Sequence, residues 1–274
     1  MTPLTVAAVQ ADPVPGDVPG NVRTAARLVR AGVDRGAALV VLGELFLPAY
    51  HPPALRASRT TDVAATADGG IDDPRLDPLR DTGAVVVIGA AVRHPDGRRT
   101  CSSLIVDRTG AITVGYDKQQ LCGPEEEELF VPGTRGATLT VDGWRFGLAI
   151  CYDGCFPEHG RAAADDDVHG YLAPSAYLAG SAHRRDVYYA ARALDNTMYV
   201  VFANSVDGTE PWRFNGGAAI YDPEGRPVTR AADRGEAVVV ATLDPTDLSR
   251  VRKEHPMLAD RFRDLGTVRR QLVA

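Results

Sequence analysis

Short apolar runs recur along the chain and predict a series of buried strands. Residues 4–10, 38–42 and 84–92 consist mostly of aliphatic residues. Runs of this length, rich in β-branched residues, are typical of strands covered on both faces. The second run is followed directly by Gly43 and Glu44, so a carboxylate is expected where a core strand ends.

Apolar residues with helical spacing predict helices between some of these strands. Residues 21–35 carry an apolar side chain every three or four positions and are followed by Gly36, a typical residue at a helix end. Residues 182–196 show the same periodicity. Shorter helices are expected over residues 158–164 and 247–253.

Four turn signals predict antiparallel hairpins in addition to the strand–helix alternation. The signals lie at residues 96–97, 108–110, 142–143 and 224–225. The strands expected around them and later in the chain cover residues 103–107, 111–116, 138–141, 144–150, 198–203, 217–221 and 237–243. This mixture favours an α/β fold with mixed sheets and outer helices. No shift in composition marks a boundary, so residues 1–274 are interpreted as a single domain.

Charge and cysteine content narrow the function classes. The net charge is −6 and no long basic run occurs, which argues against a nucleic-acid partner. No apolar run reaches the roughly 18 residues of a membrane helix, so no membrane partner is expected. The first residues lack a basic region typical of a signal peptide. The four cysteines show no secreted disulfide pattern, and we expect a cytoplasmic protein.

Three side chains at expected strand ends could carry chemistry. Cys151 follows the run 144–150, where a nucleophile would be exposed on a rigid scaffold. Glu44 sits among apolar residues, and partial burial would raise its pKa toward that of a general base. Lys118 follows the strand 111–116 and could hold an oxyanion or lower a thiol pKa. Each residue alone is more often structural or solvated than catalytic.

A metal site is an alternative use of the same region. Cys151, Cys155 and His159 are spaced four residues apart, so on a helix they would share one face. Pro157 falls inside that stretch and would interrupt the helix. No fourth ligand stands at a suitable spacing. We therefore expect no metal at this position.

Three segments, in order, resemble the nitrilase superfamily of carbon–nitrogen hydrolases. They are residues 43–46 (GELF), 116–121 (YDKQQL) and 150–158 (ICYDGCFPE). The resemblance continues at residues 130–133, 191–196, 215–225 and 260–263. It implies a four-layer α-β-β-α sandwich with two mixed sheets. It also implies a homodimer, or a higher homo-oligomer, paired across helical faces near the cysteine.

The resemblance also implies catalytic roles. Glu44 would be the general base, Cys151 the nucleophile that forms a thioester, and Lys118 the oxyanion-binding cation together with the backbone N–H of Tyr152. A second family glutamate lies four residues before Phe130. That count gives Glu126, and Glu125 and Glu127 remain open alternatives for this position. No cofactor is required.

The substrate implied is a small amide, cleaved to ammonia and a carboxylic acid. The expected pocket loops contribute Tyr50, Ser175, Ala176 and Trp212. An N-carbamoyl amide or a nitrile remains possible on the same site, as does a non-catalytic interaction protein on the same fold.

Three positions depart from the family pattern: Gly43 replaces a proline, Gln120 a histidine and Asp195 a glutamate. None removes one of the three implied catalytic groups.

Overall fold

The computed structural model describes residues 1–262 and 271–272, so Arg263, the end of the last motif named above, lies outside the described residues. The strands are β1 (Leu4–Ala11), β2 (Leu39–Val41), β3 (Val63–Ala64), β4 (Val85–Arg93), β5 (Arg99–Val106), β6 (Ile112–Asp117), β7 (Thr138–Val141), β8 (Trp144–Leu148), β9 (Gly170–Ser175), β10 (Tyr199–Thr209), β11 (Trp212–Asn215), β12 (Ala219–Tyr221), β13 (Pro227–Arg230) and β14 (Ala237–Leu243).

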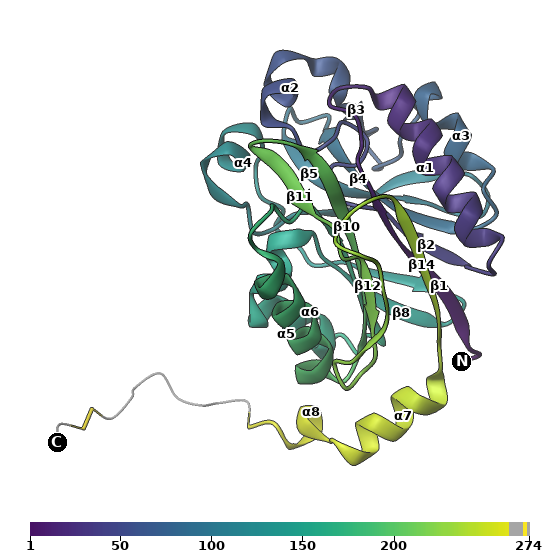
Figure 1. Ribbon diagram of the computed structural model, residues 1–274, viewed down its shortest axis with the longest axis vertical. Coiled ribbons are helices and arrows are strands. Elements are labelled where there is room, and N and C mark those ends of the chain that lie inside the picture. The colour runs from purple at the N-terminus through teal and green to yellow at the C-terminus, as the bar shows by residue number, and fades with distance from the viewer. Residues whose placement is uncertain (263–270, 273–274) are drawn as a thin grey trace.

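Helices connect and cover these strands. They are α1 (Val18–Val33), α2 (Pro52–Ala57), α3 (Asp77–Arg80), α4 (Gly123–Leu129), α5 (Pro157–Asp165), α6 (Ala182–Asn196), α7 (Pro245–Glu254) and α8 (Met257–Asp260). Short 3₁₀ turns are η1 (Arg59–Thr61), η2 (Pro74–Leu76) and η3 (Cys151–Cys155). Helices α1 and α3 lie along one side of the strands, and α5 and α6 along the other (Figure 1).

The strands follow one hydrogen-bonded path in the order β6-β5-β4-β2-β1-β10-β9-β8-β7. Strand β1 pairs with β14 along residues 4–10, and only Gln10 and Ala11 pair with Asn204 and Ser205 of β10. This short junction joins two halves of the sheet. The expected α/β fold of mixed strands is confirmed, whereas the two expected sheets are joined here into one nearly closed sheet.

Alternate side chains of the inner strands enter two different cores. In β1, Val6 and Ala8 belong to the core that includes β8, β9 and β10, whereas Ala7 and Val9 belong to the core beneath α1. Strands β2 and β4 alternate in the same way. Because both faces are covered, these runs contain no alternating polar residues. The same alternation fixes the register of the strand ends that carry the site.

All four expected hairpin turns are confirmed. Their closing pairs are Arg93 with Arg99, Val106 with Ile112, Val141 with Trp144, and Tyr221 with Pro227. Each turn contains a glycine with positive φ, a backbone conformation that glycine adopts without steric cost.

Helix α4 covers the acidic segment that contains Glu126, where the sequence analysis predicts no helix. Pro124 lies in its first turn, and Glu125 and Glu126 lie there too. Proline fits the first helical position, and carboxylates there interact favourably with the helix dipole. These signals account for the helix.

Strand β10 extends beyond its expected end at Ala203 and pairs with β11. The apolar pattern stops at Asn204, but this residue is buried and its Nδ2 donates a hydrogen bond to Gly216 O at 2.6 Å. A buried amide with such partners is compatible with a core strand. A prediction based on hydrophobicity alone therefore ended strand β10 too early.

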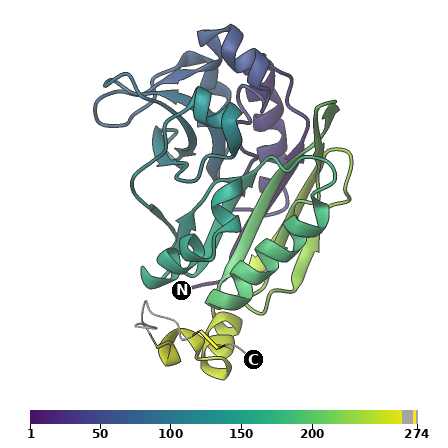
Figure 2. The same ribbon diagram turned by 90° about the vertical axis from the view of Figure 1, so that its left-hand side faces the viewer.

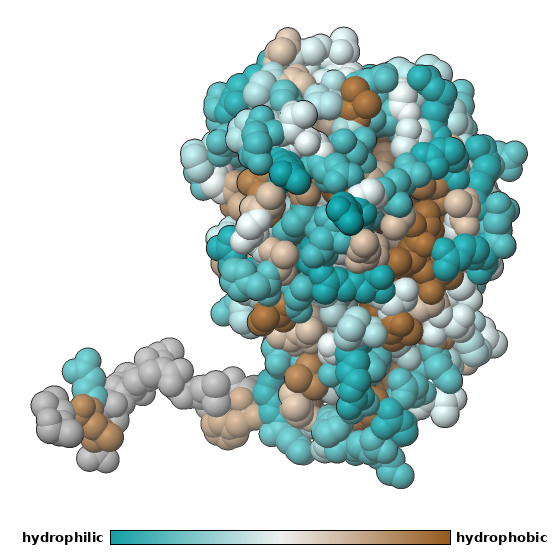
Figure 3. Space-filling view, in the orientation of Figure 1, coloured by the Kyte–Doolittle hydropathy of each residue, from teal (hydrophilic) through white to brown (hydrophobic). Residues whose placement is uncertain are grey.

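The outer surface is mixed in character. The face in Figure 3 is mainly hydrophilic, with apolar residues in scattered groups. Helices α7 and α8 lie at one end of the molecule, far from α2 and α4 at the other, as two views show (Figures 1 and 2). Within residues 1–262, no helix combines the length and apolarity needed to cross a bilayer.

Candidate active site

Four chain segments bring an acid, an amine, a second acid and a thiol together. Glu44 lies in the turn after β2, Lys118 follows β6, Glu126 lies on α4, and Cys151 begins η3 after β8. All four are buried, with Cys151 the most accessible at 9% exposure. Apart from Lys118 and Glu126, which are 8 residues apart, these segments are distant in sequence, and the fold makes their side chains neighbours.

The Lys118 ammonium lies between two carboxylates. Its Nζ is 2.6 Å from Glu44 Oε1 and 2.8 and 2.7 Å from the two oxygens of Glu126. Backbone hydrogen bonds fix Lys118 on both sides, since its N–H donates to Cys101 O and its C=O accepts from Gly133 N, each at 2.8 Å. A buried ammonium requires such paired and hydrogen-bonded surroundings.

The turn at Glu44 is held tightly between neighbouring strands. Glu44 N donates to Ser175 O at 3.3 Å, and Leu45 has a φ of +48°. Gly89 of β4 passes so close that a Cβ there would lie 2.2 Å from Leu45 N. A glycine at position 89 is therefore required for this turn to sit where it does.

Cys151 lies on a strained turn. Its φ is +46°, a conformation that costs a non-glycine residue roughly 1–3 kcal/mol and is common at functional sites. Asp153 stabilises the turn, because its Oδ2 accepts from Ile150 N at 2.9 Å and from Tyr116 Oη at 2.8 Å. Its Oδ1 accepts from Gln120 N at 2.8 Å. One buried carboxylate thus ties the cysteine turn to the segment after β6.

The environment of Glu44 favours proton exchange near neutral pH. The pKa of the Glu44 carboxyl is raised to about 7, chiefly by burial and also by the charge of Glu126. The Lys118 ammonium and hydrogen bonds to Lys118 and Cys151 act in the opposite direction. A carboxyl group with such a pKa can both accept and return a proton at pH 7.

The Cys151 thiol needs a base to become a nucleophile. Burial raises the pKa of this thiol well above its ordinary value, and the Glu44 carboxylate adds to the effect. Lys118 and the backbone N–H of Ala176 partly offset it. For Lys118, burial lowers the pKa, but the Glu44 and Glu126 carboxylates outweigh burial and raise it well above its ordinary value. The resting site therefore combines a thiol, an ammonium and a nearby carboxyl base.

A cavity of about 230 Å³ opens onto these groups. Its walls are formed by Glu44, Tyr50, Cys122, Glu126, Cys151, Tyr152, Cys155, Ala176, Tyr177, Leu178, Ser181, Arg184 and Tyr188. Of the pocket residues expected from sequence, Tyr50 and Ala176 line the cavity, as does Tyr152. The Tyr50 hydroxyl also donates to Glu126 Oε1 at 2.8 Å.

Two other expected pocket residues lie outside these walls. Ser175 is fully buried, and its hydroxyl lies 3.1 Å from both Ala173 O and the Tyr189 hydroxyl. Trp212 lines a neighbouring cavity of about 140 Å³ and packs against the Tyr50 ring at 6.3 Å. Ser175 instead contacts the site through its carbonyl, which accepts from Glu44 N.

Helix α6 contributes cavity residues that sequence reasoning missed. Arg184 and Tyr188 line the cavity and are four residues apart, so they share one helix face. The pocket residues expected from sequence include none of this helix. The helical spacing of Arg184 and Tyr188 just after Ser175 and Ala176 was the signal that could have found them.

Two of the three alternative metal ligands, His159 and Cys155, are engaged with tyrosine hydroxyls. His159 Nδ1 is 2.7 Å from the Tyr171 hydroxyl, and its Nε2 is 2.9 Å from the Tyr116 hydroxyl. Cys155 Sγ is 3.2 Å from the Tyr177 hydroxyl. In the described part of the chain, no group of three or more His, Cys, Asp or Glu side chains is arranged to hold a metal ion.

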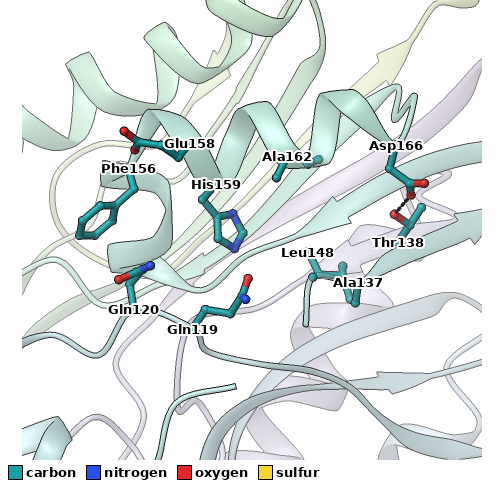
Figure 4. A pocket seen from close by; sticks show the side chains of 12 residues that line it. Gln119, Gln120, Ala137, Thr138, Leu148, Phe156, Glu158, His159, Ala162 and Asp166 are labelled. Atoms are coloured by element: carbon teal, nitrogen blue, oxygen red, sulfur yellow. Dashed lines mark hydrogen bonds between the residues drawn. The ribbon is translucent and has the colours of Figure 1, made fainter. Parts of the chain in front are cut away.

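A larger cavity, about 830 Å³, lies beside α5 and is an open groove. Figure 4 shows His159 directed from α5 toward Gln119, with Gln120 nearby. None of Glu44, Lys118 or Cys151 lines it. No cysteine lines this groove, whereas the smaller cavity brings Cys151 together with Glu44 and Glu126, so the smaller cavity is the candidate active site.

Comparisons with known proteins find amidases among the relatives of this chain. The chain is 33% identical to an (R)-stereoselective amidase of Pseudomonas sp. over 226 residues, covering 81% of this chain and 79% of the relative. An amidase from Nesterenkonia sp. AN1, with acrylamide added at its active-site cysteine, superposes with a TM-score of 0.78 at 27% identity, covering 93% of this chain and 99% of that one. The same amidase is known in complex with butyramide.

A further solved structure has a similar fold. A Saccharomyces cerevisiae member of branch 10 of the nitrilase superfamily superposes with a TM-score of 0.83 at 24% identity, covering 95% of this chain and 97% of that one. The carbon-nitrogen hydrolase family matches residues 5–253. The chain therefore belongs to the carbon–nitrogen hydrolases of the nitrilase superfamily.

Proposed function

We propose that this enzyme hydrolyses the non-peptide C–N bond of a small amide through a thioester on Cys151, releasing ammonia and a carboxylic acid. The observation that carries the proposal is the Lys118 ammonium held between Glu44 and Glu126 at the cavity that Cys151 lines. Acyl transfer needs a nucleophile, a base and a cation for the oxyanion, and this set supplies all three.

In the first half-reaction, Glu44 removes the proton of Cys151, and the sulfur attacks the amide carbon. The tetrahedral oxyanion is bound by Lys118 and by the backbone N–H of Tyr152. One such donor typically lowers the barrier by about 3–4 kcal/mol. Glu44 then protonates the leaving nitrogen, the C–N bond breaks, and ammonia departs from the acyl-enzyme.

In the second half-reaction, water replaces ammonia. Glu44 takes a proton from the water, the hydroxyl oxygen attacks the thioester carbon, and the C–S bond breaks. The proton returns to the sulfur of Cys151, and the carboxylic acid leaves. Glu126 keeps Lys118 in place throughout, because its two oxygens accept hydrogen bonds from the ammonium.

The size of the cavity and the relatives support a small amide. A volume of about 230 Å³ lies below the roughly 300–1,000 Å³ of drug-sized ligand sites. The related Nesterenkonia enzyme binds butyramide, and the Pseudomonas relative is a stereoselective amidase. An N-carbamoyl amide and a nitrile are the competing substrates on the same catalytic groups.

Ammonia release from three compounds of similar size tests this proposal. The compounds are butyramide, ethylurea (a neutral N-carbamoyl amine) and butyronitrile, all uncharged, each assayed with wild type and with Cys151→Ala. We expect butyramide to give the highest kcat/KM and the variant to be inactive. A faster reaction with either of the other compounds would replace the amide assignment. Turnover of none of them would favour a non-catalytic role.

We also propose that the two sheet halves act as the two sheets of the family's four-layer α-β-β-α sandwich, and that two chains pair across α5 and α6. Exposed Val187 and Leu194 on α6 support such pairing, with 63% and 47% of their surfaces accessible. Sedimentation velocity should give a dimer for wild type and a smaller species for Val187→Glu. A monomeric wild type would contradict the pairing.

A further inference from the structure

The active-site cavity contains one charged group that the proposed mechanism does not use. Its charged lining residues are Glu44, Glu126 and Arg184. Both carboxylates bind Lys118, as described above. Arg184, near the start of α6, is the remaining charge at the cavity wall.

The Arg184 guanidinium differs sharply from that of its neighbour. Arg185 is fully buried and binds Asp186, Asn215 and Asp233. Arg184 is exposed, and within residues 1–262 no hydrogen bond or ion pair of its side chain is found. Arg185 therefore serves the structure, whereas the donors of Arg184 are available to a bound molecule.

The charge of Arg184 acts on another residue of the cavity wall. Cys155, another lining thiol, has its pKa raised by burial, and the positive charge of Arg184 is among the influences that lower it. Tyr188 lies one helical turn after Arg184 and lines the same wall. Its hydroxyl is a second polar group on this side of the cavity.

The catalytic groups themselves would disfavour an anionic substrate. With Glu44 ionised, the two glutamates and Lys118 sum to one negative charge in a buried place, where charges interact strongly. A cation at the cavity wall offsets this repulsion. Guanidinium groups bind carboxylates through two parallel hydrogen bonds, which also fixes the orientation of the ligand.

We propose that Arg184 forms an anion subsite and that the preferred substrates are small amides whose other end carries a carboxylate. This inference rests on the proposed amide hydrolysis, but the subsite itself can be tested without turnover. The carboxylate binds the guanidinium of Arg184, while the amide carbon faces Cys151. Substrate charge, rather than size alone, then determines selectivity.

Alkylation of Cys151 tests the subsite independently of hydrolysis. Iodoacetate and iodoacetamide are of similar size and differ in charge, and each loses iodide as the sulfur–carbon bond forms. Peptide mass mapping gives the rate at Cys151 for each. The ratio of the iodoacetate to the iodoacetamide rate should fall about tenfold in Arg184→Gln, the lower end expected for a charged hydrogen bond at an exposed group.

Two further variants make this test specific. Arg23→Gln, on α1 at the opposite side of the molecule, removes the same charge from an exposed residue and should leave the ratio at its wild-type value. Arg184→Lys keeps the charge and should restore part of the ratio. Raising the salt concentration should reduce the wild-type ratio, because exposed charges are screened. An Arg184→Gln ratio equal to that of wild type would overturn the subsite.

Steady-state kinetics then tests the substrate class. Succinamic acid carries a carboxylate and butyramide does not, and ammonia release is measured for both. We expect wild type to favour succinamic acid, and Arg184→Gln to lower the ratio of the two kcat/KM values by about tenfold, mainly through KM. Equal use of both amides by wild type would refute the substrate class. If the alkylation ratio responds but neither amide is hydrolysed, the proposed function fails while the anion subsite stands.

Discussion

Both carboxylate oxygens of Glu126 lie within 2.8 Å of the Lys118 ammonium. Of the three adjacent candidates for this position, Glu126 is buried, Glu125 is half-buried and Glu127 is exposed. Helix α4 therefore presents one glutamate to the site and directs another to solvent. We infer that Glu126 orients Lys118. The exposed Glu127 is a matched control for testing this role.

Replacing Glu126 by Gln should lower kcat by about 10²-fold, the scale observed when an oxyanion donor is lost or misplaced. The amide cannot balance the buried ammonium, so Lys118 shifts from its position. Steady-state ammonia release measures the effect. Glu127→Gln removes the same charge one residue away and should retain wild-type kcat. Equal activity of the two variants would contradict the role of Glu126.

The pH profile should report the raised pKa of Glu44. Below a pH of about 7 the carboxyl group binds a proton and can no longer accept one from Cys151. The acid limb of kcat/KM should therefore be centred near pH 7 rather than near the ordinary value of 4.5. Glu44→Gln should be inactive at every pH. An acid limb at pH 4–5 would show that a different base is used.

The raised pKa of Glu44 also makes the stability of the folded protein depend on pH. The folded state holds the Glu44 proton more tightly than the unfolded chain does, so this contribution to stability is complete below pH 4.5 and is lost as the pH rises through about 7. The Tm difference between wild type and Glu44→Gln, which cannot titrate, should therefore change in favour of the variant over this range. A difference independent of pH would contradict the raised pKa.

Asp153 should be required for both stability and activity. It accepts hydrogen bonds from Ile150 N, Gln120 N and the Tyr116 hydroxyl while fully buried. In Asp153→Asn the amide nitrogen faces a donor, and a buried unsatisfied group costs about 1–3 kcal/mol. Tyr116→Phe removes only one of these bonds and should cost less. Urea unfolding measures both, and a smaller loss for Asp153→Asn would contradict the network.

Gly89 should tolerate no side chain, because its Cβ would lie 2.2 Å from Leu45 N. Overpacking of this kind typically costs 1–3 kcal/mol, and here it would also displace Glu44. Gly89→Ala is thus expected to lower both the free energy of unfolding and kcat. Gly136→Ala, where a Cβ would meet nothing within 4 Å, serves as the control. Equal stability of the two variants would argue against the tight turn.

Many strands and turns of the fold could be predicted from the sequence because they depend on local sequence patterns. The apolar runs of β1, β2 and β4 are continuous since both of their faces are covered, and glycine-containing turns mark the hairpins. The proximity of Glu44, Lys118 and Cys151 followed from a resemblance and not from spacing. No local sequence pattern indicates that the strand ends carrying these three residues lie close together.

The remaining features depend on tertiary contacts. Asn204 looked like the end of a strand, but Gly216 satisfies its side chain in the folded core. Ser175 was expected in the pocket, whereas strand alternation turns its hydroxyl toward Tyr189. Arg184 reaches the cavity only because α6 begins beside it. Such features require the path of the whole chain, which periodicity does not give.

The most direct test of the central claim is the mass of the Cys151 peptide after acid quenching during turnover of butyramide. We predict a butyryl thioester on Cys151 that is lost on treatment with hydroxylamine. We also predict that folded Cys151→Ala shows no adduct and no ammonia release. An acyl group on Cys122 or Cys155 instead, or sustained hydrolysis by Cys151→Ala, would contradict the assignment of the nucleophile.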